Sequence, residues 1–122
     1  MHKLLTILLA AAALTVAGCA RHPQITQQDV EKQIVNKSAG GGLDAWTFGP
    51  EEPRKVELVD TKYSGDKAEI VVHVTTQDVP KPIFGHTDPP HKAAGKIRCH
   101  YEWIGNSWTL ARIEKLDFSE TQ

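Results

Sequence analysis

The sequence predicts an α+β fold, in which one N-terminal helix packs on a bent antiparallel sheet of about four strands. Three observations carry this prediction. Apolar residues recur at helical spacing in residues 26–39. Residues 55–77 and 95–118 each alternate apolar and polar residues on both sides of a glycine-containing turn, which is typical of β-hairpins.

The predicted helix has signals at both ends. Thr26 is a suitable N-cap, and Asp29 would lie near the positive end of the helix dipole. The three glycines at 40–42 are expected to end the helix. Its apolar stripe is narrow and consists of Val30, Ile34 and Val35. Such a helix must pack on a larger element to be stable.

The first hairpin is expected to turn at Gly65-Asp66. That turn sets Tyr63 opposite Ala68 and Thr61 opposite Ile70. Val56 and Leu58 fall out of phase with the alternation, which indicates a bulge or bend. One face is then expected to collect the apolar side chains of Val59, Tyr63, Ala68, Ile70, Val72 and Val74.

Residues 79–92 contain four prolines, a density that excludes a central strand. We expect a loop there, with a short edge segment around Ile83-Phe84.

The second hairpin shows the clearest alternation. Its turn at Gly105-Asn106 sets Trp103 opposite Trp108, and a phase change predicts a bulge near Ala111. The residues expected to point into the core from its first strand are Ile97, Cys99, Tyr101 and Trp103.

The N-terminus has the pattern of a secretory signal. Lys3 precedes an uncharged run over 4–17, and small residues follow. Val16-Ala17-Gly18-Cys19 resembles the lipobox of bacterial lipoproteins. The resemblance implies that residues 1–18 are a cleaved signal peptide and that Cys19 is lipidated. Residues 19–24 would then be a short tether and residues 25–119 a single domain.

The lipobox resemblance also implies a location and one partner. Acyl chains on Cys19 would hold the protein on a membrane of the cell envelope. Ala20 follows the cysteine, where an aspartate retains many Gram-negative lipoproteins in the inner membrane. The expected location is therefore the periplasmic face of the outer membrane, if the organism is Gram-negative. Since lipidation consumes Cys19, Cys99 must be buried or pair with another chain.

The mature domain has a looser resemblance to small cystatin-like and NTF2-like domains. It rests on the order of the elements and on Trp108, Leu110 and Ile113 near the end of the chain. The resemblance implies a helix wrapped by a bent sheet. Without residues 1–18 the chain has 13 Lys and Arg against 15 Asp and Glu, so nucleic acid is not an expected partner.

Three sets of side chains are candidates for chemistry. His86 and His91 flank Asp88, but this spacing belongs to no structured metal motif, so they are only weak candidates and no metal or cofactor is expected. Cys99 and His100 should point to opposite faces of a strand and cannot form a catalytic pair. His73 and His100 share the less apolar face, where an acid–base pair is conceivable and a solvated surface more common.

Trp46 and Phe48 stand apart from any periodic segment. They would cover one end of the core or serve as contacts for a partner.

Taken together, the sequence features lead us to expect a non-catalytic, membrane-anchored envelope lipoprotein with a protein-binding or scaffolding domain, whose partner is another envelope protein. The alternatives are a periplasmic inhibitor or immunity lipoprotein, and a binder of a small ligand or metal.

Overall fold

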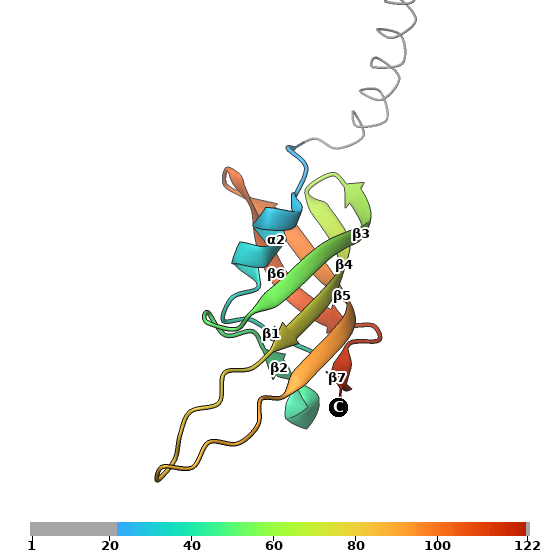
Figure 1. Cartoon of the computed structure of the whole chain (residues 1–122). Coiled ribbons are helices and arrows are strands. Elements are labelled where there is room, and N and C mark those ends of the chain that lie inside the picture. Colours follow the sequence, from blue (N-terminus) through green and yellow to red (C-terminus); the bar gives the residue numbers. More distant parts are fainter. Residues whose placement is uncertain (1–21, 122) are drawn as a thin grey trace, which may run out of the picture.

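A computed structural model describes residues 22–121, which form one curved sheet with a short helix against its inner face (Figure 1). The elements are α2 (Gln27–Gln33), β1 (Ser38–Ala39), the 3-10 helix η1 (Gly42–Asp44), β2 (Trp46–Thr47), β3 (Arg54–Ser64), β4 (Lys67–Gln77), β5 (Lys92–Ile104), β6 (Ser107–Lys115) and β7 (Ser119–Thr121). No helix within residues 22–121 is long and apolar enough to span a bilayer. The expected signal peptide and the lipidated Cys19 lie outside the described residues.

The expected fold class is wrong. The described residues contain seven strands in one mixed sheet and one short α-helix, instead of a helix on about four antiparallel strands. The strands follow the order β2-β1-β6-β5-β4-β3, and β7 pairs with the start of β5. The sheet is mixed because β1 runs parallel to β6, whereas every other pair is antiparallel.

The helix is shorter than predicted: it ends at Gln33, before the glycines at 40–42. Thr26 and Asp29 form a complete capping box, which confirms the predicted start. Ile34 is the C-cap, and Asn36 takes a left-handed φ of 63°. Ala39, which the prediction placed in the helix, instead pairs with Trp46 and Ile113.

The β3–β4 hairpin confirms the predicted register, with Tyr63 opposite Ala68 and Thr61 opposite Ile70. The register shifts between Leu58 and Asp60, at the predicted irregularity. The shift turns Val59 to solvent and puts Val56 in the core, so the expectation that Val59 faces inward is wrong.

The β5–β6 hairpin also confirms its predicted register. Trp103 lies opposite Trp108, and the register shift leaves Ala111 without a partner on β5. β5 is longer than expected, so its first residues extend past β6 and pair with β7, Lys92 opposite Thr121. β7 passes so close to β5 that Gly95, with φ 137°, faces the backbone of Phe118.

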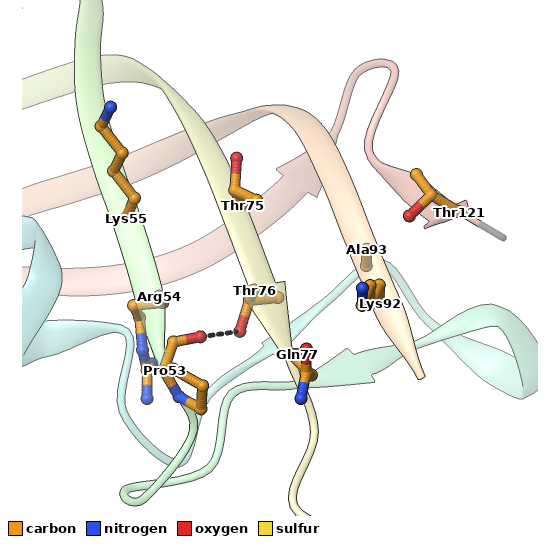
Figure 2. Close-up of a pocket in the computed structure, with 9 residues that line it drawn as sticks. All are labelled: Pro53, Arg54, Lys55, Thr75, Thr76, Gln77, Lys92, Ala93 and Thr121. Atoms are coloured by element: carbon orange, nitrogen blue, oxygen red, sulfur yellow. Dashed lines mark hydrogen bonds between the residues drawn. The ribbon is translucent and has the colours of Figure 1, made fainter. Parts of the chain in front are cut away.

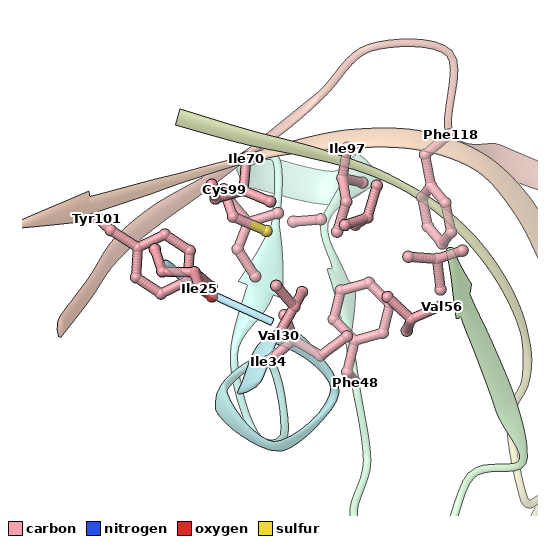
Figure 3. Close-up of a cluster of buried hydrophobic side chains, with 14 of the residues drawn as sticks. Ile25, Val30, Ile34, Phe48, Val56, Ile70, Ile97, Cys99, Tyr101 and Phe118 are labelled. Atoms are coloured by element: carbon pink, nitrogen blue, oxygen red, sulfur yellow. The ribbon is translucent and has the colours of Figure 1, made fainter. Parts of the chain in front are cut away.

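The core lies between the inner face of the sheet and α2 (Figure 3). Val30 and Ile34 reach it from the helix, and Cys99 is a buried free thiol on β5. Each large apolar side chain that is fully buried contributes roughly 1.5–3 kcal/mol relative to exposure. The largest of these side chains are Tyr101, Phe48, Ile34, Ile70, Ile97, Val30, Val56, Val72, Val74 and Cys99.

Candidate functional site

The start of the described chain is fixed to the turn ends of both hairpins. The imidazole of His22 is stacked on the indole of Trp103, with the ring centroids 3.9 Å apart and the planes 7° from parallel. Its Nε2 donates a hydrogen bond to Asp66 Oδ1, in the β3–β4 turn, at 2.8 Å. The Trp108 ring lies nearly perpendicular to the His22 ring, with the two centroids 5.5 Å apart.

Two backbone groups complete this attachment. Trp108 Nε1 donates to the carbonyl of Pro23 at 2.8 Å, and the amide of Ile25 donates to the Tyr63 hydroxyl at 2.7 Å. Residues 22–25 therefore lie against the β3–β4 and β5–β6 turns, at what we call the entry end of the domain (Figure 1).

A long loop, residues 78–91, extends from the opposite end of the sheet, which we call the far end (Figure 1). At its tip Ile83 and His86 form two backbone hydrogen bonds of 2.7 and 2.9 Å. Phe84 and Gly85 between them have φ values of 52° and 78°, as in a type I′ turn. We call residues 83–86 the tip turn.

Phe84 is an unusual occupant of the tip turn. Its side chain is 105% exposed, and its backbone is in the left-handed region, which costs a non-glycine residue roughly 1–2 kcal/mol. Ile83 and Val79 in the same loop are also more than half exposed. The sequence predicted a short edge segment around Ile83-Phe84 but no binding role for Phe84. The available signal was an aromatic residue within a proline-rich segment that cannot fold back as a central strand.

The residues predicted as partner contacts lie elsewhere. Phe48 is 0% exposed, and its ring packs against Phe118 at a centroid distance of 5.8 Å. Trp46 is half-buried and contacts the edge of the same ring at 6.0 Å. Phe48 thus has no accessible surface to offer a partner, and Trp46 retains only part of its own.

The two weak metal candidates bind different carboxylates. His86 Nε2 donates to Asp88 Oδ1 at 2.9 Å, whereas His91 Nδ1 lies 3.5 Å from Glu120 Oε1. Within residues 22–121, no three His, Cys, Asp or Glu side chains come together in a metal-binding group.

A polar network lies on the outer face of the sheet. His100 Nε2 donates to Glu114 Oε1 at 3.0 Å, and Arg98 Nη1 donates to the same oxygen at 3.3 Å. The pKa of Glu114 is lowered below its ordinary value, mainly by the hydrogen bond from His100 and to a smaller extent by that from Arg98. The network joins β5 to β6 across their register shift.

The described geometry does not assemble a catalytic group around this network. His73 lies opposite Lys96 on β5, four residues before His100, so the Cα atoms of the two histidines are offset by about 13 Å along the strands. Cys99 points into the core, where burial raises the pKa of its thiol to about 12. Among the described residues, therefore, neither the imidazole of His73 nor the thiol of Cys99 reaches His100.

A shallow pocket of about 450 Å³ lies at the base of the far-end loop (Figure 2). The side chains of Lys55 and Arg54, which are successive residues of β3, point to opposite faces of the sheet (Figure 2). Lys55 Nζ pairs with Glu57 Oε1 at 3.3 Å, and an Arg54 Nη2 group donates to the carbonyl of Gly49. Arg54 and Lys55 therefore do not converge on one point in this pocket.

No family model, no curated protein and no solved structure matches this chain.

Proposed function

We propose that this protein is a lipid-anchored, non-catalytic envelope protein that binds another protein through its far end. The lipobox-like Val16–Cys19 segment supports the anchor, and the exposed tip turn supports the binding surface. The observation that carries the proposal is the attachment of His22 at the entry end, because an anchor on Cys19 would then lie at the end of the domain opposite the tip turn.

The attachment of His22 determines how the domain would stand on a membrane. Cys19 precedes His22 by three residues, a distance of at most about 11 Å in an extended chain. Acyl chains on Cys19 would therefore hold the entry end beside the bilayer. The loop 78–91 would point away from the bilayer, toward proteins of the envelope.

Phe84 is the side chain best suited to bind a partner. Aromatic residues that fill a pocket dominate many protein interfaces. Phe84 combines full exposure with a backbone conformation that favours glycine or asparagine, so the folded domain gains nothing from a phenylalanine there. A strained residue without intramolecular contacts is expected where binding supplies the missing contacts.

The anchor is tested with the Cys19→Ala variant. We expect wild-type protein to incorporate labelled fatty acid, to lose residues 1–18 and to float with vesicles, and we expect the variant to do none of these. Intact mass of the mature protein provides the direct measurement. An unmodified Cys19, or a chain that still begins at Met1, would contradict the proposal.

The binding surface is tested by replacing Phe84 or, as a control, Ile104 with a photoreactive amino acid in cells. We expect a discrete cross-linked product from position 84 only. An excess of the wild-type domain should compete for the partner and reduce the yield of this product, whereas an excess of a Phe84→Asn domain should not. Phe84→Asn should itself be about 0.5–1 kcal/mol more stable than wild type, because it relieves the strain at φ 52°. Equal products from both positions, or equal competition by both domains, would contradict the assignment.

A further inference from the structure

We propose that the entry end is a bilayer contact, in which Ile104 enters the headgroup region of the membrane to which Cys19 is anchored. This inference rests on the proposed lipid anchor and adds a defined orientation to it. The partner is a lipid surface and differs from the protein proposed for the far end.

The first argument is the short chain between anchor and domain. His22 is stacked on Trp103, the residue immediately before Ile104. A lipidated Cys19 lies at the boundary between headgroups and hydrocarbon, at most about 11 Å along the chain from His22. The headgroup layer of one leaflet is itself roughly 5–8 Å thick. The β5–β6 turn therefore cannot stand far from the lipid surface.

The second argument is the apolar surface at this turn. Ile104 is 58% exposed, although its neighbours Gly105 and Asn106 form a tight turn that requires no apolar side chain. The fold buries little of the Ile104 side chain, whereas insertion into the edge of a bilayer would bury it and so contribute favourable free energy.

The third argument is the aromatic composition of the entry end. Trp103, Trp108 and Tyr63 surround the attached chain, with the Trp103 and Trp108 centroids 5.4 Å apart and those of Tyr63 and Trp108 5.9 Å apart. Tryptophan and tyrosine are enriched where proteins meet the headgroup layer, since their rings combine apolar surface with one polar group. The half-buried Trp103 lies next to the exposed Ile104.

The charges at the entry end do not oppose such a contact. Asp66 accepts the hydrogen bond from His22, and Lys67 lies opposite Glu102 on the neighbouring strand. Residues 62–67 and 102–107, which form the two turns, carry two lysines and two carboxylates. Approach of an anionic bilayer therefore meets no concentrated negative patch at these turns.

The test places a fluorescent probe at either end of the full, lipidated protein. Ile104→Cys and the matched control Phe84→Cys are labelled with an environment-sensitive dye. The dye should spare Cys99, whose thiol is buried and whose pKa is raised to about 12. Each protein is reconstituted into phosphatidylethanolamine–phosphatidylglycerol vesicles that contain a headgroup-attached quencher lipid.

We expect the probe at Ile104 to shift to the blue and to be quenched at least about twofold more strongly than the probe at Phe84. Equal quenching of the two probes, or no quenching at Ile104, overturns the bilayer contact. A probe at Ile104 that is shifted to the blue, but is quenched only by a second labelled copy of the chain and not by the quencher lipid, assigns the entry end to self-association and also overturns the bilayer contact.

A second measurement requires no substitution. Hydrogen exchange of the wild-type protein should slow at Gly105 and Asn106 when the lipidated form is bound to vesicles, relative to the unlipidated domain, and should not change at residues 83–86. Flotation of the same samples separates the two proposals. Protein that does not float refutes the lipid anchor, whereas protein that floats with unchanged exchange at the β5–β6 turn refutes only the bilayer contact.

Discussion

The imidazole of His22 lies parallel to the indole of Trp103, 3.9 Å away, and donates a hydrogen bond to Asp66. This relationship attaches the N-terminal segment to two turns that are distant in sequence. It converts what would be a flexible tether into part of the folded domain, because the stacked ring and the hydrogen bond must both be lost before residues 22–25 can detach.

His22→Ala should lower the free energy of unfolding by about 1–2 kcal/mol, through loss of the stacked pair and the hydrogen bond. It should also speed hydrogen exchange at the Ile25 amide, whose partner is the Tyr63 hydroxyl. Denaturant unfolding and amide exchange of the unlipidated domain provide the measurements. His86→Ala, which removes only an exposed hydrogen bond to Asp88, is the control and should change stability by less than about 0.5 kcal/mol. Equal effects of the two substitutions would refute the attachment.

Two tyrosines should respond in opposite ways to loss of the hydroxyl group. The Tyr101 hydroxyl is buried with no hydrogen-bond partner within residues 22–121, so Tyr101→Phe should be neutral or stabilise by up to about 1 kcal/mol. The Tyr63 hydroxyl accepts the Ile25 amide, so Tyr63→Phe should cost about 1 kcal/mol. Thermal and denaturant melts of the two variants test this. A destabilised Tyr101→Phe protein would mean that this hydroxyl has a partner after all.

Gly95→Ala should be among the most damaging small substitutions in the domain. A Cβ atom there would lie 2.5 Å from Phe118 Cα and 2.6 Å from the Asp117 carbonyl oxygen, so β7 would have to move away from β5. The expected cost is about 3 kcal/mol or more, measured by denaturant unfolding. Gly105→Ala is the matched control. Its φ of 66° is also positive but its surroundings are open, so it should cost only about 1–2 kcal/mol. Similar costs at both positions would show that β7 does not pack as closely as described.

Glu114 should make stability depend on pH in the acidic range. Because the hydrogen bond from His100 lowers the pKa of Glu114 below about 4.5, its contribution is fully present above that pH. The contribution is lost as the pH falls through the lower pKa of the folded state. The difference in unfolding free energy between wild type and Glu114→Gln should therefore narrow as the pH falls below about 5. In a His100→Ala background this narrowing with falling pH should be smaller. Narrowing as large as in the wild-type background would exclude His100 as the cause of the lowered pKa.

Cys99 should be inert in the native protein. It is buried, and burial raises the pKa of its thiol to about 12, so little thiolate exists near neutral pH. Alkylation of the unlipidated domain, with Cys19 replaced by Ala, should be slow under native conditions and complete after denaturation. Cys99→Ala should cost roughly 1 kcal/mol through lost packing. Rapid native alkylation would place the thiol at the surface and restore an intermolecular disulfide as its role.

The sequence by itself determined the two hairpins, their registers and the start of the helix. Strict alternation selects one face of a strand, and a glycine-containing turn fixes which residues lie opposite each other, as for Trp103 and Trp108. The capping box of Thr26 and Asp29 involves groups only three residues apart. These features depend on neighbours along the chain, so a linear pattern is sufficient to predict them.

The tertiary structure alone decided the number of strands, the end of the helix and the position of the candidate surfaces. Ala39 leaves the predicted helix because Ile113, far along the chain, provides a strand to pair with. Phe48 is buried because Phe118 returns to cover the same end of the core, and Phe84 is exposed because no strand of residues 22–121 reaches the loop tip. His22 is fixed by partners on two separate turns. Each of these outcomes depends on contacts between segments that are distant in sequence, and local propensity and periodicity carry no information about such contacts.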